Sequence, residues 1–419
     1  MTLPPDQLRR PVLVAGYGLA STLGPDLESA IRYLATLGLP APQSRELVPG
    51  ESWPHFPLAA PANADSWYPR AKQLIEQVVA ECGGAGERSA PLFVASSSIN
   101  IGAVELGESA GGDCLAFSER VAGWLDWAGP VFWINTACTS AINALASAQR
   151  LIESGAAESA LVLGLEIDNR YSAAGFAGMQ LLSPDAPQPL AAGRKGLVLG
   201  EAVAAVWLQA GDESESCDAE HRADELAENP GATVRIPVGR PTGGAFSRPS
   251  GIPDGRKKNQ STPLRWRLRG GANVVDGRDP AGASEAAVKA MAQQALLSAG
   301  LEARQIDLVK LQAAGSPHND GAEIAGLREV FGELPALLSL KPLLGHTLGA
   351  AGAAELVLLL ACLEAGTWPP QRNDDPDPAL AARLAEVAPA RVRYLLAVIL
   401  GFGGGHAALV LEDTWAGRA

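Results

Sequence analysis

The chain has 419 residues, of which 47% are hydrophobic and 19% are charged, so it has enough apolar side chains for one large core or two ordinary ones. Its formal net charge of −13 is spread along the sequence, which argues against broad attraction to nucleic acid or to anionic lipid. We therefore expect a globular protein that does not bind nucleic acid.

The cysteines and the apolar segments indicate the cellular compartment and whether the chain crosses a membrane. Its 5 cysteines lack CxxC spacing and metal-ligand spacing, which favours a reducing cytoplasm. The apolar run 11–20 resembles a signal peptide only faintly, because it is short and contains two glycines, and we predict a buried strand there. The later apolar stretch 356–362 is too short to span a bilayer. We predict no membrane span, no metal and no organic cofactor.

Strands and helices alternate along the chain, and their order occurs twice. The first part is expected to contain strands at 12–15, 92–96, 131–135, 160–166, near 197 and at 202–207, with helices at 70–81 and 139–153. The later part is expected to contain helices at 285–298, 321–330 and 349–364, with strands at 308–311, 337–340, 397–400 and 407–411. This repetition indicates an internally duplicated α/β protein.

The two predicted halves span 1–262 and 263–419. The first ends in a long polar connection, 211–262, which has little apolar periodicity. A basic stretch runs from Arg256 to Arg269. We interpret this stretch as a solvated loop, with a docking surface for an acidic carrier protein as the alternative.

Cys138 lies where an apolar strand gives way to a helix. The segment 135–140 reads Asn-Thr-Ala-Cys-Thr-Ser, which places the cysteine at the predicted helix N-terminus. There the helix dipole and the unpaired amides favour the thiolate, so a lowered pKa is expected for Cys138. A lone cysteine in such a place is more often a small buried apolar residue, and only its context can decide between the two interpretations.

The corresponding place in the second half is the segment 341–352, which contains Lys341 and His346. Here too a strand ends, a glycine-rich turn follows and a long helix begins. If the two halves pack about a pseudo-twofold axis, the starts of the equivalent helices meet, and Cys138 faces His346. Small residues such as Gly349 and Gly352 permit close helix packing.

Four segments of the chain resemble motifs of the β-ketoacyl carrier-protein synthases, which have a thiolase-like fold. Residues 136–140 resemble the nucleophile motif and 341–346 the motif with a lysine and the second histidine, while 194–201 and 400–405 resemble two further conserved segments. The motifs occur in the family's order, and the resemblance extends from about residue 12 to residue 412. It implies two duplicated βαβαβαββ halves in a five-layer α-β-α-β-α sandwich.

The resemblance also implies roles for individual residues. Enzymes of this family move an acyl group from phosphopantetheine to a cysteine and then condense it with the enolate of a decarboxylated malonyl thioester. Cys138 would be the nucleophile, and its amide and that of Phe402 would form an oxyanion hole. His346 would polarise the malonyl thioester carbonyl, and Lys341 and Glu201 would orient the site. Phe402, followed by Gly403 in the glycine-rich loop, would gate the acyl pocket.

One departure from the family pattern bears directly on the chemistry. Gln312 stands where the family has its first catalytic histidine, and Asp320 follows in register as a supporting residue. Glutamine can donate a hydrogen bond but cannot exchange a proton, so decarboxylative condensation would be slowed or lost. His318 falls at a variable loop position, and we do not favour it as the replacement base.

Three other histidines lie outside these roles. His406 stands where the family usually has asparagine, and we predict a hydrogen-bonded structural residue. His55 and His221 lie outside every motif and are predicted to be surface residues.

Three functions remain open. The leading hypothesis is an acyl-transferring ketosynthase of a fatty-acid-like or polyketide-like pathway, served by an acyl carrier protein. The second is a partner subunit similar to a chain length factor, and the third is an acyltransferase that does not decarboxylate and uses His346 alone as base. The resemblance implies a dimer formed by sheets joined edge to edge, either a homodimer or a heterodimer with a related subunit. The acyl chain length depends on residues near Asn100, Ile101, Phe176 and Met179.

Overall fold

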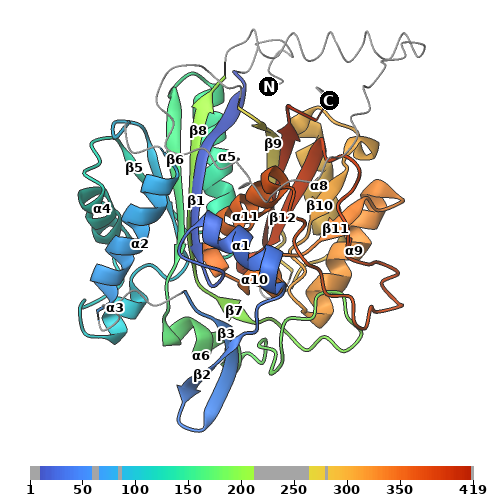
Figure 1. Cartoon of the computed structure of the whole chain (residues 1–419), viewed down its shortest axis with the longest axis horizontal. Helices are drawn as coiled ribbons and strands as arrows, with labels where there is room; N and C mark the ends of the chain where they lie inside the picture. Colours follow the sequence, from blue (N-terminus) through green and yellow to red (C-terminus); the bar gives the residue numbers. More distant parts are fainter. Residues whose placement is uncertain (1–9, 59–65, 84–86, 212–263, 279–281, 417–419) are drawn as a thin grey trace, which may run out of the picture.

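We analysed a computed structural model of the chain, which describes residues 10–58, 66–83, 87–211, 264–278 and 282–416 (Figure 1). The predicted boundary between residues 262 and 263, nearly all of the connection 211–262, the basic residues 256–258 and His221 lie outside the described residues.

In the described part of the chain, ten strands form one sheet made of two equivalent halves. The N-terminal half contains β1 (Val12–Ser21), β4 (Leu92–Ala95), β5 (Val131–Ile134), β6 (Ser159–Glu166) and β8 (Ala202–Ala210). The C-terminal half contains β9 (Trp266–Val275), β10 (Leu308–Lys310), β11 (Ala336–Leu338), β12 (Tyr394–Leu400) and β13 (Gly405–Asp413).

The two halves have the same strand order and the same strand directions. From the outer edge inward the orders are β5-β4-β6-β8-β1 and β11-β10-β12-β13-β9. In each half the first two pairings are parallel and the last two are antiparallel. The inner strands β1 and β9 pair with each other along Val12–Val14, which joins the halves. The predicted duplication is therefore present strand by strand.

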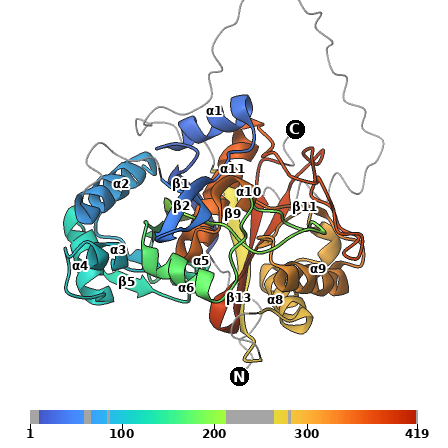
Figure 2. The same cartoon turned by 90° about the horizontal axis from the view of Figure 1, so that it is seen from below.

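Helices form three layers around the two half-sheets (Figures 1 and 2). The equivalent helices α5 (Ser140–Glu153) and α11 (Ala351–Ala365) pack against each other in the centre and contact strands of both halves. Helices α2 (Trp67–Glu81) and α4 (Cys114–Trp124) cover the outer face of one half, and α8 (Glu285–Ala299) and α9 (Pro317–Phe331) cover the other. This confirms the predicted five-layer arrangement.

Several elements were not predicted from the sequence. They are α1 (Leu27–Leu37), the hairpin β2 (Gln43–Val48) and β3 (Glu51–Phe56), the helices α3 (Ile101–Glu105), α4, α6 (Arg170–Gly178) and α10 (Lys341–Leu344), and strand β9. The strand predicted near residue 197 is β7 (Leu199–Gly200), which pairs with β3. Short 3₁₀ turns occur at η2 (Ala303–Gln305), η3 (Leu348–Ala350) and η4 (Phe402–Gly404).

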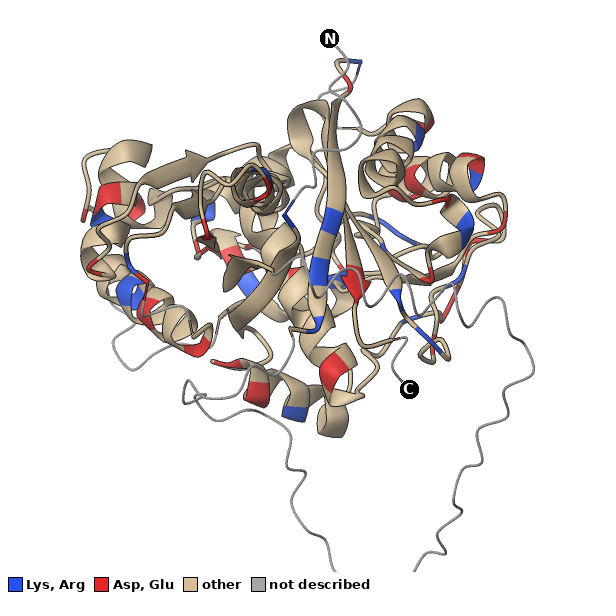
Figure 3. Cartoon of the chain, turned by 90° about the horizontal axis from the view of Figure 1, so that it is seen from above, with Lys and Arg blue, Asp and Glu red and all other residues tan. Residues whose placement is uncertain are grey.

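Strand β9 overturns the interpretation of residues 265–269 as a solvated loop. Trp266 and Leu268 point into the core, and the arginines alternate with them. Arg265 pairs with Asp413 at 2.7 Å, and Arg269 pairs with Glu412 at 3.2 Å. Two of these arginines therefore bind carboxylates of the neighbouring strand. Acidic and basic residues occur in both halves of the described chain (Figure 3).

Helix α11 forms the centre of the core. In the described residues, one segment, Leu348–Ala365, is long and apolar enough to cross a membrane by length and composition. However, 83% of that segment is buried inside the protein, between the two half-sheets. It is therefore packed as a core helix.

Candidate active site

Cys138 is held in a strained turn between β5 and α5. Ala137, just before it, has a φ of 52°, in the left-handed region that side chains with a Cβ rarely adopt. The hydroxyl of Ser140 stabilises this turn, because it accepts from the Thr136 N–H at 2.9 Å and donates to the Ala137 carbonyl at 2.6 Å. The turn directs Cys138 inward, where 3% of its surface is exposed.

His346 follows helix α10 and is fixed through its main chain. Its N–H donates to the Val198 carbonyl at 2.7 Å. Gly345 has a φ of 69°, and a Cβ at this position would lie 2.8 Å from the Leu199 carbonyl oxygen. Only glycine fits this approach, which sets the position from which the His346 ring points toward α5.

The two halves bring Cys138 and His346 together. The Nε2 atom of His346 lies 3.1 Å from the Cys138 sulfur, and its Nδ1 atom lies 3.1 Å from the Lys341 ammonium. An ammonium group can only donate, so Nδ1 must accept, and the proton of the neutral ring is on Nε2, facing the sulfur. The expected meeting of the two helix starts is therefore present.

A buried cluster of charges lies behind His346. The carboxylate of Glu355 on α11 pairs with Lys341 and, at 2.5 Å, with Lys310. Sequence reasoning missed Glu355, although a glutamate within an apolar helix requires a buried cation as partner. Glu201, which was expected to help orient the site, instead lies within hydrogen-bonding distance of His55 (3.1 Å).

The protonation states differ from the expectation for Cys138. Burial raises the pKa of the Cys138 thiol, although the Phe402 amide and the charge of Lys341 act in the opposite direction. The predicted lowering of this pKa is therefore wrong, because desolvation outweighs the donors around the sulfur. Burial, and then the charges of Lys341 and Lys310, hold the pKa of His346 well below its usual range. The free site thus favours a neutral thiol beside a neutral imidazole.

Two backbone amides act on the sulfur. The N–H groups of Phe402 and of Cys138 itself are close enough to work against the rise of the Cys138 pKa that burial causes. Phe402 starts the turn η4, in which Gly403 and Gly404 have φ values of 78° and 73°. The Phe402 ring lies edge-on to that of Phe176, with ring centroids 5.0 Å apart. The roles of these amides as oxyanion donors and of Phe402 as a gate stay predictions, and Phe176, expected near the acyl pocket, contacts Phe402.

Gln312 lies in a loop that two carboxylates of α9 hold in place. The N–H groups of Gln312 and Ala313 donate to Glu323 at 2.7 and 2.8 Å, and the N–H of Ala314 donates to Asp320 at 3.2 Å. Burial raises the pKa of Asp320 to about 6 and that of Glu323 to about 8. Asp320 therefore supports the loop that carries Gln312, and Glu323 shares this task.

Cys138, Gln312, His346, Phe402 and His406 line one cavity of about 30 Å³. This volume matches roughly one water molecule. Among the described residues, the Gln312 side-chain oxygen and both ring nitrogens of His406 have no hydrogen-bond partner. The geometry does not show the hydrogen bonds that were predicted for a structural His406, although the backbone of Gly405 acts on its pKa in the direction of such a bond.

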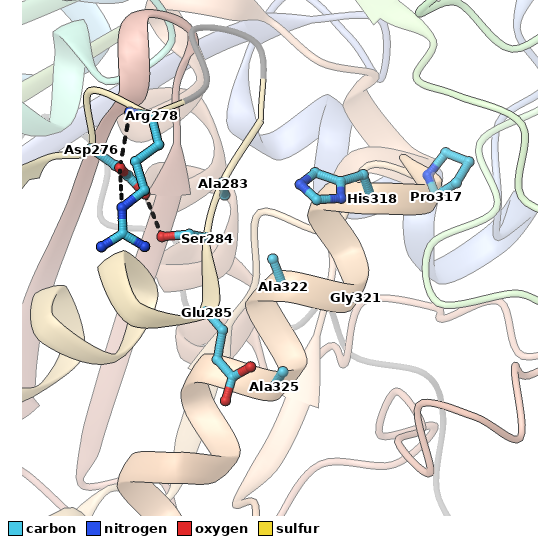
Figure 4. Close-up of a pocket in the computed structure, with 10 residues that line it drawn as sticks. All are labelled: Asp276, Arg278, Ala283, Ser284, Glu285, Pro317, His318, Gly321, Ala322 and Ala325. Atoms are coloured by element: carbon cyan, nitrogen blue, oxygen red, sulfur yellow. Dashed lines mark hydrogen bonds and ion pairs between the residues drawn. The ribbon is translucent and has the colours of Figure 1, made fainter.

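A larger cavity of about 700 Å³ adjoins the first (Figure 4). The two share Ala283, and the larger is also lined by Asp276, Arg278, Ser284 and His318. His318 extends from the first turn of α9 and is exposed. It lines the larger cavity and does not line the one that contains Cys138.

His55, predicted to be on the surface, is buried with 7% of its surface exposed, so that prediction is wrong. Its ring and the carboxylates of Asp168 and Glu201 offer ligand atoms within 4.8 Å of one another. However, Arg45 pairs with Asp168, and Arg70 pairs with Glu201. We interpret this group as a buried ion-pair network, and the expectation that no metal or cofactor is needed stays a prediction.

Two family models match the chain and together cover about half of it. The model described as "Beta-ketoacyl synthase, N-terminal domain" matches residues 107–214, and "Beta-ketoacyl synthase, C-terminal domain" matches residues 268–375. The first match contains Cys138, and the second contains Gln312, Lys341 and His346.

Two known proteins are similar to part of the chain. Nodulation protein E of Rhizobium meliloti is 27% identical over 292 residues, covering 68% of this chain and 62% of that protein. The 3-oxoacyl-acyl-carrier-protein synthase 2 of Vibrio harveyi is 28% identical over 298 residues, with the same coverage of 68% and 62%. The matched segments thus span less than two thirds of either relative.

A solved structure has the same fold. In the complex of a ketosynthase with its chain length factor from Xenorhabdus doucetiae, the matching chain gives a TM-score of 0.73 at 21% identity. The match covers 98% of this chain and 100% of that one, so the fold resemblance extends over both halves.

Proposed function

The chain belongs to the β-ketoacyl synthase family, and on that premise we propose that it is an acyltransferase that carries an acyl group on Cys138 and extends it by decarboxylative condensation. The observation that carries this proposal is the 3.1 Å contact between the Cys138 sulfur and the His346 Nε2 atom, which joins the two halves of the chain.

In the first step, the sulfur of Cys138 attacks the thioester carbonyl of an acyl group on phosphopantetheine. The carbonyl oxygen becomes an oxyanion, and the amides of Cys138 and Phe402 are the donors that would stabilise it. The phosphopantetheine thiolate then leaves and takes up the proton of the Cys138 thiol. Because Lys341 keeps the proton of His346 on Nε2, the ring presents an N–H to the sulfur throughout this exchange.

In the second step, a malonyl thioester loses CO2 and leaves an enolate. The electron pair of the broken bond moves onto the thioester oxygen, where the His346 Nε2–H would stabilise it once Cys138 is acylated. The enolate carbon attacks the acyl carbon, and the carbon–sulfur bond to Cys138 breaks. Gln312 supplies at most a hydrogen bond, because an amide cannot exchange a proton.

A second candidate function rests on Gln312. A chain that replaces the first histidine of the family can serve as the partner subunit of a complete ketosynthase, in the manner of a chain length factor. In that case Cys138 would not turn over without the related subunit.

We propose that an acyl carrier protein donates the acyl group to this chain. We also propose that the chain assembles as a homodimer or as a heterodimer with a related subunit. The name of the Vibrio harveyi relative supports the carrier protein, and the Xenorhabdus doucetiae complex supports pairing with a related chain. We also propose a cytoplasmic location. The described cysteines Cys114, Cys138 and Cys362 are free thiols, which agrees with a reducing compartment.

Intact-mass measurement tests the proposal. The protein is incubated with an acyl carrier protein that bears a medium-chain acyl group, before and after addition of malonyl carrier protein, with Cys138→Ala as the control. A mass gain that the control lacks supports acyl transfer, and its discharge as a 3-ketoacyl product supports condensation. Failure of the isolated chain to become acylated would favour the partner subunit, and discharge without decarboxylation would favour the simple acyltransferase.

A further inference from the structure

His406 is a buried histidine whose ring has no hydrogen-bond partner. It is the second residue of β13, its main chain is paired with Leu400 and Val274, and 1% of its surface is exposed. Among the described residues, neither ring nitrogen finds a partner. Burial of an unpartnered polar group costs folding free energy that an apolar side chain of similar size would not cost. This arrangement therefore indicates a ligand that completes the bonds.

The cavity that His406 lines is the one that holds the reacting groups. Cys138, His346 and Gln312 line the same cavity, and the oxygen of Gln312 is unpartnered as well. His406 lies in β13 just after the turn η4, and Gln312 lies in the loop that follows β10. Two side chains with unused hydrogen-bonding capacity thus line the same cavity as the Cys138–His346 pair.

Burial favours the neutral form of the His406 ring. Burial lowers the pKa of His406, while the charge of Asp276 and the backbone of Gly405 act in the opposite direction. The Gly405 contact does not have the geometry of a hydrogen bond, so both ring nitrogens keep their capacity. Asp276 itself accepts the hydroxyl of Ser284 and lies 3.8 Å from Arg278, so its carboxylate has other partners (Figure 4). A neutral imidazole presents one N–H donor and one acceptor nitrogen.

We propose that His406 is a second catalytic imidazole of this cavity, one that donates a hydrogen bond to the thioester oxygen of the malonyl group. This inference rests on the proposed condensing function and assigns it a further residue. When CO2 leaves, the electron pair of the broken bond moves onto that oxygen, and the His406 N–H stabilises the enolate beside the N–H of His346. When the enolate carbon bonds to the acyl carbon, the pair of the carbon–sulfur bond returns to Cys138 as a thiolate, which takes one proton from water to restore the thiol, and no electron is gained or lost.

The test separates catalysis from folding with the variant His406→Leu, which keeps a similar volume. We expect acylation of Cys138 at the normal rate, single-turnover condensation slowed by roughly 100-fold or more, and a melting temperature unchanged or raised. His318→Leu, in the exposed histidine of the adjoining cavity, serves as the matched control and should leave both rates unchanged. Equal losses of acylation and condensation, a lower melting temperature, or normal condensation would overturn the proposal.

A binding measurement keeps the proposal testable if the wild-type protein is not acylated. Histidine ring nitrogens are labelled with ¹⁵N, and the protein is titrated with a malonyl-pantetheine analogue that has an amide in place of the thioester. The His406 resonance, identified by its loss in His406→Leu, should shift on binding. Absence of a shift would refute the role of His406, whereas a shift without any acylation would count against the proposed function alone. A wild-type protein that is acylated but does not condense would also refute the proposed role of His406.

Discussion

Lys341 connects the buried charges on α11 to the reacting pair. Its ammonium touches Nδ1 of His346 and the carboxylate of Glu355, and its charge is one of the causes that hold the pKa of His346 down. The side chain thus fixes both the position of the ring proton and the pH range over which the ring stays neutral.

The variant Lys341→Met should raise the pKa of His346 toward its usual range. Loss of the nearby charge makes protonation of the ring easier, so the ring becomes charged at a higher pH than in the wild type. We expect the acidic limb of the pH profile for iodoacetamide alkylation of Cys138 to move upward, because loss of the same charge also removes a cause that lowers the pKa of the Cys138 thiol.

Lys310→Met is the matched control, because Lys310 pairs with the same carboxylate but has no hydrogen bond to the His346 ring. Its effect on the acidic limb should be smaller. Equal shifts in the two variants would mean that loss of the buried ion pair, rather than the contact with Nδ1, controls the ring.

At this scale the sequence predicted Cys138, His346, Lys341, Phe402 and Gln312, because each lies in a motif at the end of a strand. It could not predict the pKa of Cys138, since a helix terminus favours the thiolate while burial opposes it, and only the packed structure shows which effect is larger. The free ring of His406 was also beyond reach, because a missing partner cannot be read from a motif.

Turn η4 places the Phe402 amide at the sulfur, and its two glycines have different requirements. Both have left-handed φ values, but a Cβ on Gly404 would lie 1.7 Å from the Asp276 carbonyl oxygen, whereas one on Gly403 would meet open space. At Gly403 a side chain would be disfavoured by the left-handed conformation alone. At Gly404 it would be disfavoured by the conformation and also by the collision with Asp276.

We therefore expect Gly403→Ala to lower the free energy of unfolding by about 1 kcal/mol. Gly404→Ala should cost more, on the order of 3 kcal/mol, because the backbone must also move away from Asp276. Denaturant unfolding of the two variants measures both values, and slower acylation of Cys138 in Gly404→Ala would report a displaced Phe402 amide. Equal costs would contradict the role given to the Asp276 contact.

Helix α9 holds the Gln312 loop through buried carboxylates, which makes stability depend on pH. The folded protein raises the pKa of Glu323 from 4.5 to about 8, so between these values the folded state binds more protons than the unfolded state. The free energy of unfolding should therefore fall as pH rises through this range, by up to about 1.4 kcal/mol per pH unit for one such group.

Glu323→Gln removes this titration and should flatten the pH dependence of denaturant unfolding between pH 4.5 and about 8. Glu329→Gln is the control, because Glu329 lies on the same helix but pairs at the surface with Lys289. An unchanged slope in Glu323→Gln would assign the pH dependence to other groups, Asp320 first among them.

Elements were predictable where one face is strongly apolar. Helices α2, α5 and α8 were expected within a few residues of their observed ends, because their buried positions recur at helical spacing. Helix α11 is buried on all sides, and its long apolar run after a glycine-rich turn made it predictable. The hairpin of β2 and β3 was missed because its side chains are mostly exposed and do not alternate cleanly. Strand β9 was missed because its arginines suggested a loop, although Trp266 and Leu268 alternate with them at the period of a strand.

The whole molecule repeats one unit about its centre, and the repetition leaves its two outer edges different. The edge strand β11 is covered, because the Leu337 carbonyl accepts the N–H of Ala385 and the Ser339 N–H donates to Gln371. The opposite edge strand, β5, pairs only with β4 among the described residues. Its Phe132 side chain is stacked on Phe93 with 40% of its surface exposed.

An apolar edge strand that carries no charge is a surface to which a second strand readily adds. Residues 131–134 of β5 read Val-Phe-Trp-Ile, so β5 has none of the charges or prolines that protect free edges. We therefore expect the dimer to form by antiparallel pairing of β5 with the same strand of a second copy, or with that of a related subunit. This edge also lies next to the turn that carries Cys138, so pairing would cover the approach to the site from that side.

Phe132→Arg tests this assembly at the strand itself. A charge at the paired edge should raise the dissociation constant of the dimer at least tenfold, about 1.4 kcal/mol, measured by sedimentation across a concentration series. Leu297→Arg places the same charge on α8, at an apolar side chain with 82% exposure in the opposite outer layer, and should leave association unchanged. If both variants associate like the wild type, β5 is not the interface. If the wild type stays monomeric until a related ketosynthase is added and Phe132→Arg blocks that pairing, the edge is correct and the assembly is the heterodimer.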